Sequence, residues 1–116
     1  MCSLNDIQEI VKLSYLYDFY GPLLKERHRE IFAAYVLDDL SLSEIANECE
    51  ITRQGVYDIV KRCSRKLEEY EEKLKLFERF QQAKERLGQV EELVRSGRDE
   101  DREKILGLTR EIYDIL

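Results

Sequence analysis

The side chains with the clearest chemical potential lie in one short stretch, residues 52–66. Arg can grip guanine and Gln can grip adenine through paired hydrogen bonds, whereas Thr and Lys suit phosphate oxygens. The stretch carries five Lys and Arg against one Asp, a local charge of +4. It therefore predicts a nucleic-acid-binding surface with the following members: Thr52, Arg53, Gln54, Tyr57, Lys61, Arg62 and Arg65.

A helix-turn-helix would position these side chains, because its second helix presents its N-terminal turns to the major groove. The motif needs a small residue where its two helices cross, and Ala46 supplies one. Glu50 departs from the motif, since glycine usually stands at this point of the turn; a positive φ there costs a residue with a side chain about 1 kcal/mol. The spacing from Ala46 predicts these inward-facing residues: Ile45, Cys49, Ile51, Val56 and Ile59.

Local signals predict where the helices of this motif begin and end. Residues 41–44 have the Ser-x-x-Glu pattern of a capping box, and Thr52 is a predicted N-cap for the following helix. No strong helix breaker lies between Val56 and Leu87, and apolar residues recur at three- and four-residue steps as far as Phe77. We therefore expect a long recognition helix that continues past the motif.

Further helices are predicted on both sides. Residues 6–20 are apolar around most of a helical cylinder, which predicts burial on two sides, and Gly21-Pro22 ends that helix. A second helix is expected over residues 23–37. Near the C-terminus, Ser96-Gly97 predicts the turn of an antiparallel hairpin. Two matching apolar stripes favour that hairpin: Ala83, Leu87, Val90 and Val94, then Ile105, Leu108, Ile112 and Ile115.

Together these elements predict an all-α fold, with a wingless helix-turn-helix domain in residues 1–66 and a helical extension in residues 67–116. The 116-residue chain has a net charge of −6, which argues against non-specific affinity for nucleic acid and confines contact to the local basic stretch. The apolar surplus of residues 6–20 and the seam from Leu67 to Phe77 predict self-association as a homodimer. No apolar run spans a bilayer and no signal peptide is recognisable, so a cytoplasmic protein is expected, without membrane insertion.

The sequence offers no catalytic or metal site. His28, the single histidine, falls on an apolar helix face and is interpreted as a core or boundary residue. Cys2, Cys49 and Cys63 form no Cys-x-x-Cys pair, which predicts reduced thiols. The acidic clusters at residues 68–72 and 99–101 lack metal-ligand spacing and are interpreted as solvated surface. We therefore expect no enzyme, no cofactor and no metal.

Residues 38–80 resemble the YlxM-like family of small bacterial helix-turn-helix proteins. The run ITRQGVYDIVKR, residues 51–62, is the most specific piece, and residues 15–30 fit the same pattern. The resemblance implies a likeness to the promoter-reading C-terminal domain of sigma factors, region four. It also implies a regulatory or accessory role in the signal recognition particle pathway, with components of that particle as partners. It transfers the recognition surface to these residues: Thr52, Arg53, Gln54, Tyr57, Lys61 and Arg62.

Three functions stay open at this point. The first is a DNA-binding regulator, and the second is an RNA-binding accessory of the targeting particle. Tyr57 bears on the second, because it is predicted to face outward and can stack on an unpaired base. The third is a protein-interaction adaptor in which the helix-turn-helix geometry serves packing alone.

Overall fold

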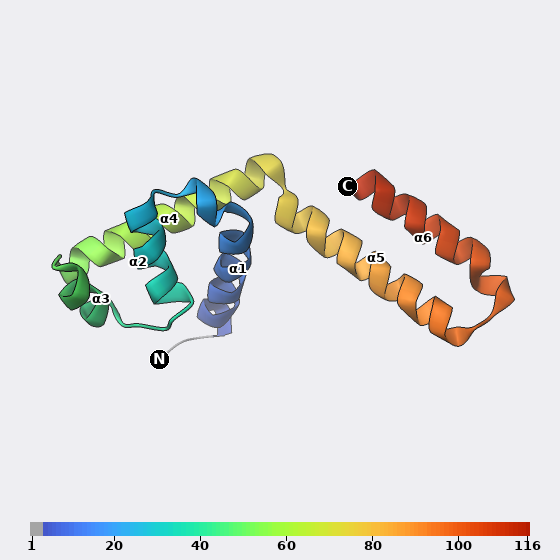
Figure 1. The fold of residues 1–116 in the computed structure, drawn as a ribbon, viewed down its shortest axis with the longest axis horizontal. Coiled ribbons are helices and arrows are strands. Elements are labelled where there is room, and N and C mark those ends of the chain that lie inside the picture. The colour runs from blue at the N-terminus through green and yellow to red at the C-terminus, as the bar shows by residue number, and fades with distance from the viewer. Residues whose placement is uncertain (1–3) are drawn as a thin grey trace. The chain divides into compact units, whose positions relative to one another are not determined.

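The computed structural model describes the backbone of residues 4–116 and the side chains of residues 8–116. Within this part, six α-helices and two short 3-10 segments form without any strand (Figure 1), which confirms the all-α class. No helix of the described chain is long and apolar enough to cross a membrane. The elements in chain order are α1 (Leu4–Tyr20), η1 (Gly21–Leu23), α2 (Glu26–Val36), α3 (Leu42–Cys49), α4 (Arg53–Leu74), α5 (Leu76–Ser96), η2 (Asp99–Asp101) and α6 (Arg102–Ile115).

The helices gather into two compact units that divide between Leu74 and Lys75. The first unit contains α1 to α4, and the second contains α5 and α6. Helix α4 thus belongs whole to the first unit, although the sequence analysis drew its domain boundary within this helix at residue 66. Separate functions for residues 1–66 and 67–116 stay a prediction.

Helix α4 is the central element of the first unit, because α1, α2 and α3 all pack against it (Figure 1). Each helix contributes to one shared core, and Tyr17 stacks on Phe32 with ring centroids 5.8 Å apart. Burying each large apolar side chain stabilises the unit by about 1.5–3 kcal/mol. The largest fully buried side chains of this core are Tyr20, Phe32, Leu16, Ile45, Leu67, Val56 and Cys63.

Helix α1 buries one face within this chain. Leu13, Leu16 and Tyr20 are buried, whereas Val11 is 48% exposed and Tyr15 is 42% exposed. The prediction of burial on two sides is therefore wrong for the single chain, because α4 and α2 cover only one side of α1. An apolar strip of α1 stays in contact with solvent.

The local signals at helix ends are confirmed. Pro22 lies in η1, directly after α1. Ser41 and Glu44 form a capping box in which the Glu44 amide donates to Ser41 Oγ at 3.1 Å and the Ser41 amide donates to Glu44 Oε1 at 3.2 Å. Gly97 follows α5 in the left-handed conformation, at φ 66°. Each signal acts through the residue's own backbone or its nearest amide, so residue type alone suffices to predict it.

The stretch without strong helix breakers contains the end of one helix and the start of the next. Helix α4 ends at Leu74, Lys75 takes a left-handed conformation at φ 55°, and α5 begins at Leu76. The expected long recognition helix that continues past the motif is therefore confirmed as far as Leu74, but it stops well before Leu87, and the seam from Leu67 to Phe77 divides between α4 and α5. No Gly or Pro marks the interruption, and a left-handed lysine costs roughly 1–2 kcal/mol.

The second unit is a hairpin of α5 and α6, which lie alongside each other as the sequence predicts (Figure 1). The apolar stripe of α6 is partly buried throughout, at residues Ile105, Leu108, Ile112 and Ile115. On α5 the expected stripe is wrong at Leu87 and Val94, which are 55% and 60% exposed. The side of α5 that is covered carries Ala83, Arg86, Val90 and Leu93 instead, in steps of three and four residues.

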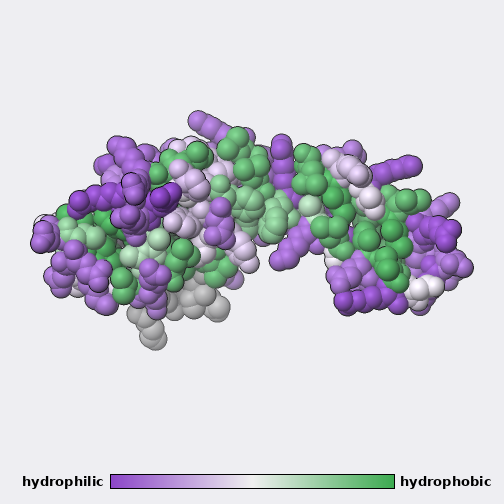
Figure 2. Space-filling model, in the orientation of Figure 1, coloured by the Kyte–Doolittle hydropathy of each residue, from purple (hydrophilic) through white to green (hydrophobic). Residues whose placement is uncertain are grey.

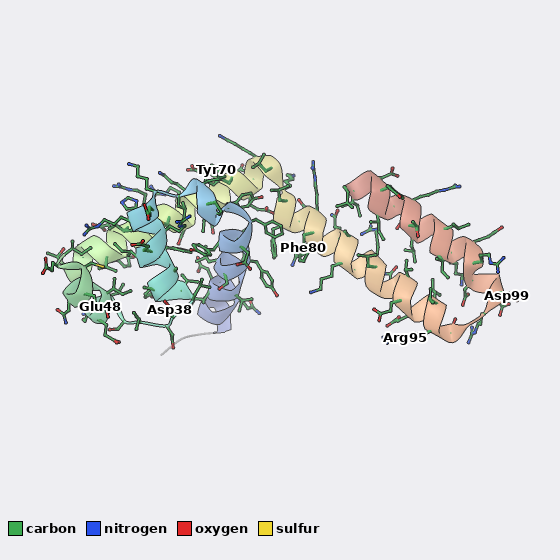
Figure 3. All side chains as sticks on the ribbon, viewed as in Figure 1. Asp38, Glu48, Tyr70, Phe80, Arg95 and Asp99 are labelled. Atoms are coloured by element: carbon green, nitrogen blue, oxygen red, sulfur yellow. The ribbon has the colours of Figure 1, made fainter. Side chains whose placement is uncertain are left out.

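Asp101 is buried, with 6% of its surface exposed, so the interpretation of residues 99–101 as solvated surface is wrong for this side chain. The Ser96 hydroxyl lies 3.0 Å from Asp101 Oδ2, and the Lys104 ammonium lies 3.9 Å from Oδ1. These polar partners offset the cost of burying the carboxylate. Asp101 therefore helps to hold the connection between α5 and α6, the segment in which Figure 3 labels Asp99.

Candidate nucleic-acid interface

A tight turn joins α3 to α4. Glu50 adopts the left-handed conformation at φ 56° and ψ 39°, the geometry for which the motif usually uses glycine. The Ile51 amide donates to the Ala46 carbonyl at 3.1 Å, and the Gly55 amide donates to Thr52 Oγ1 at 2.9 Å. Thr52 is thus confirmed as the cap of α4. The result is two helices joined by a three-residue turn, the local geometry of a helix-turn-helix.

Apolar side chains lock α3 against α4. Ile45 and Ala46 of α3 and Val56 of α4 are buried as predicted. The other expected inward positions, Cys49, Ile51 and Ile59, are only partly buried. Helix α4 also buries a residue that the predicted seam omitted, Val60, along with Cys63 and Leu67.

The opposite side of α4 carries the predicted binding residues, all of them exposed. Residues four apart share a helix face, so the predicted residues of α4, together with Asp58 and Lys66, form two adjacent rows. We call these rows together the α4 face. The first row is Arg53, Tyr57, Lys61 and Arg65; the second is Gln54, Asp58, Arg62 and Lys66. Thr52 precedes both rows in the turn.

Two interactions organise the α4 face. Gln54 Nε2 donates to Asp58 Oδ1 at 3.0 Å, and the Lys61 ammonium lies 5.6 Å from the centroid of the Tyr57 ring. Since the Gln54 amide nitrogen has two hydrogens, one stays available for a base while Asp58 holds the other. The sequence analysis missed this role of Asp58, although the spacing of four residues from Gln54 was a usable signal.

The cations of the α4 face have no carboxylate partner. Among residues 8–116, neither Arg53, Lys61, Arg62 nor Arg65 forms an ion pair; the pairs Arg86–Glu111, Arg95–Glu91 and Lys104–Asp101 lie in the second unit. The one acid of the face, Asp58, accepts its hydrogen bond from Gln54. The face therefore presents its positive charge to whatever approaches it.

His28 lies on α2 where that helix meets α4, and it is partly buried, as a core or boundary residue should be. Burial lowers its pKa below the ordinary value of 6.5, and the positive charges of Lys25, Arg62, Lys66 and Arg27 lower it further. The imidazole is therefore neutral near pH 7.

Cys63 is an inert core thiol. Its Sγ lies 3.7 Å from the His28 carbonyl oxygen, and burial raises its pKa, although Lys66 and Arg62 oppose that rise. Cys49 is also a free thiol, whereas Cys2 lies outside the described residues. No group of three or more His, Cys, Asp or Glu in the described chain could hold a metal ion. The chemistry that the α4 face offers is the binding of an anion by its exposed cations.

Comparison with known proteins shows the family to which this helix-turn-helix chain belongs. Residues 7–106 match the UPF0122 family, described as "Putative helix-turn-helix protein, YlxM / p13 like". A UPF0122 protein of Geobacillus sp. (strain WCH70) is 39% identical over 109 residues, which cover 94% of this chain and 98% of that protein.

Two further relatives agree. UPF0122 protein YlxM of Bacillus subtilis (strain 168) is 42% identical over 95 residues, covering 82% of this chain and 86% of the relative. A UPF0122 protein of Bacillus pumilus (strain SAFR-032) is 47% identical over 88 residues, covering 76% and 80%. These matches confirm the resemblance drawn from residues 51–62. The chain belongs to the UPF0122 family of YlxM-like helix-turn-helix proteins.

Proposed function

We propose that this protein is a regulatory nucleic-acid-binding protein that contacts its target through the α4 face. One observation carries the proposal: four cations, Arg53, Lys61, Arg62 and Arg65, stand exposed on one side of a rigid helix without ion-pair partners, in a chain whose net charge is −6. A monomeric acidic protein gains nothing in stability from such a surface, whereas a phosphate backbone attracts it.

Duplex DNA is the target that this geometry favours. A helix with its side chains is about 10–12 Å across, and the major groove of B-DNA is about 12 Å wide. Thr52 and the first turns of α4 then meet base edges, with Arg53 and the Gln54 amide held by Asp58 as the readers. This role agrees with the likeness to sigma-factor C-terminal domains that the sequence implies.

A second candidate is an RNA-binding accessory of the signal recognition particle pathway, the role that the family resemblance implies. Tyr57 favours it, because the residue is 42% exposed and its ring lies under the Lys61 ammonium. An unpaired base can stack on such a ring beside a cation. The major groove of an RNA duplex is too deep and narrow to admit α4, so the RNA target would be single-stranded or a loop.

We also propose that the second unit joins two copies of the chain. Leu87, Val94, Leu106 and Tyr113 are between 55% and 78% exposed. Hydrophobic side chains gather along α5 and α6 on the face seen in Figure 2. Two helices alone cannot enclose a core, but two hairpins can pack as a four-helix bundle. A homodimer would present two α4 faces to one target.

A competition titration tests the proposal and separates the two targets. Fluorescence anisotropy would follow the release of a labelled duplex by unlabelled duplex or by unlabelled hairpin RNA, at about 50 mM to about 200 mM KCl. Regulation through DNA predicts that the duplex competes better, with a log affinity that falls linearly against log salt. Better competition by hairpin RNA would establish the accessory role, and absence of binding to both probes would refute the proposal.

A further inference from the structure

A second group of cations overlaps the α4 face and includes residues of two helices. We call it the α2–α4 cluster: Lys25, Arg27 and His28 at the start of α2, with Arg62 and Lys66 on α4. Lys25, Arg27, His28 and Lys66 were not among the binding residues predicted from sequence. Their proximity depends on how α2 packs on α4, which no local pattern encodes.

Two contacts fix the position of the cluster. The Cys63 thiol approaches the His28 carbonyl at 3.7 Å, which holds the first turn of α2 against the middle of α4. The Arg27 guanidinium donates to the Cys49 carbonyl at 3.4 Å, at the last residue of α3. Arg27 therefore lies beside the turn that leads into α4, whereas His28 lies against the middle of α4, where Arg62 and Lys66 stand.

The charges of the cluster repel one another. Lys25, Arg27, Arg62 and Lys66 are all close enough to His28 to disfavour its protonated form. None of these four cations forms an ion pair within the described chain. Glu26 and Glu30 are exposed and lie on the side of α2 away from His28, whereas Glu30 and Glu48 line one pocket with Arg27 without forming an ion pair with it. Such a cluster is relieved by an external anion.

The length of α4 favours a phosphate backbone as this anion. Arg62 comes nine residues after Arg53, which places it about 14 Å further along the helix at 1.5 Å per residue. That distance exceeds the major-groove width of about 12 Å. With the first turns of α4 in the groove, Arg62 and Lys66 therefore lie at its edge, where the backbone runs. Lys25 and Arg27 at the start of α2 add positive charge close to these two residues.

We infer that the α2–α4 cluster binds the sugar-phosphate backbone at the edge of the groove that α4 enters, so that two helices clamp one strand. This inference rests on the proposed function. It assigns a division of labour, in which the first turns of α4 discriminate between bases and the cluster supplies affinity that is independent of sequence.

The test compares the full-length protein with the double variant Lys25→Gln, Lys66→Gln. Binding to a random-sequence DNA duplex of about 30 base pairs would be followed by anisotropy from about 50 mM to about 200 mM KCl. Two lost phosphate contacts should lower the slope of log affinity against log salt by about 1.8 and weaken binding roughly 10- to 100-fold near 0.1 M salt. The double variant Lys25→Arg, Lys66→Arg should keep the full slope.

A matched control removes the same charge elsewhere. Arg102→Gln with Arg110→Gln changes two exposed cations of α6 and should leave the slope unchanged. Equal losses in both double variants would indicate a general effect of net charge and overturn the inference. An unchanged slope in Lys25→Gln, Lys66→Gln would overturn the inference alone, since the wild-type protein would still bind. Absence of wild-type binding would instead refute the proposed function and the inference with it.

Discussion

In the first unit, three helices bury their apolar faces against α4 while the cations of the α4 face have no ion-pair partner; in the second, charged side chains of α5 and α6 form ion pairs while large apolar side chains are exposed. Arg86 bonds to Glu111 across the hairpin at 3.0 Å, and Arg95 pairs with Glu91, with Arg95 labelled on α5 in Figure 3. Leu106 and Tyr113 of α6 are 55% and 78% exposed. This difference is the basis for proposing an anionic partner for the first unit and another apolar surface as the partner of the second.

The largest expected effect concerns the core. Phe32→Ala removes a fully buried ring from the first unit and should lower the free energy of unfolding by about 3–5 kcal/mol. Leu106→Ala, at an exposed position of the second unit, should lower the stability of the monomer by less than about 0.5 kcal/mol. Urea titration of both variants at low protein concentration checks the contrast. Equal losses would show that the second unit has a core of its own.

The next effect concerns self-association. Leu106→Lys with Tyr113→Lys places charge on the exposed face of α6 and should weaken dimerisation by at least about tenfold. Gln81→Lys with Gln89→Lys adds the same charge at exposed polar positions of α5 and should leave the dimer intact. Sedimentation equilibrium measures both. A wild-type protein that sediments as a 13.9 kDa monomer at tens of micromolar would contradict the dimer.

What the sequence predicts well is local. The Ser41 capping box, the Thr52 cap and the left-handed Gly97 each depend on a residue type and its nearest amides, so all three were predictable. The break at Lys75 carries no such signal, because lysine ordinarily continues a helix. On α5, two helix faces have similar apolar content, so periodicity alone does not determine which face is buried. The predicted stripe includes Leu87 and Val94, which are exposed.

The residues of the candidate site also fall into two groups: those that local spacing predicts and those that only tertiary packing brings together. The exposure of Arg53, Lys61 and Arg65 follows from their spacing on one amphipathic helix, which the sequence contains. The gathering of Lys25 and Arg27 beside Arg62 follows from the packing of α2 on α4, which brings together residues far apart in the chain. A periodicity analysis of single helices cannot reveal a cluster of that kind.

Substitution of two residues in the left-handed conformation should change stability by a smaller amount. Glu50 lies in the turn of the first unit and Gly97 in the turn of the second. Glu50→Gly should stabilise the first unit by up to about 1 kcal/mol, because glycine adopts φ 56° without the steric cost of a Cβ. Gly97→Ala should destabilise the hairpin by a similar amount, although no atom lies within 4 Å of the added Cβ. Thermal denaturation followed by circular dichroism measures both shifts. Two shifts of the same sign would contradict this explanation.

The smallest effect is a pH dependence confined to the first unit. His28 has a pKa below 6.5 in the folded chain, under burial and the charges of Lys25, Arg27, Arg62 and Lys66, so the unfolded chain binds its proton more readily. Stability is therefore complete above about pH 6.5 and falls as the pH decreases towards the folded pKa.

Comparing the midpoint of thermal unfolding at about pH 7.5 and about pH 5.5 tests this dependence. The decrease should be smaller in His28→Gln than in the wild-type protein. The second unit has no histidine, so a variant there such as Leu106→Ala should keep the full pH response of the wild type. A response in His28→Gln as large as that of the wild type would contradict the assignment.

The most direct test of the central claim is the affinity of the double variant Arg53→Ala, Lys61→Ala for nucleic acid. Both side chains are exposed on α4 and have no ion-pair partner, so their removal should leave the fold intact. Anisotropy titration should show at least about a tenfold loss, while Arg102→Ala with Arg110→Ala binds as the wild type does. An affinity of the Arg53→Ala, Lys61→Ala protein equal to that of the wild type would contradict binding through the α4 face.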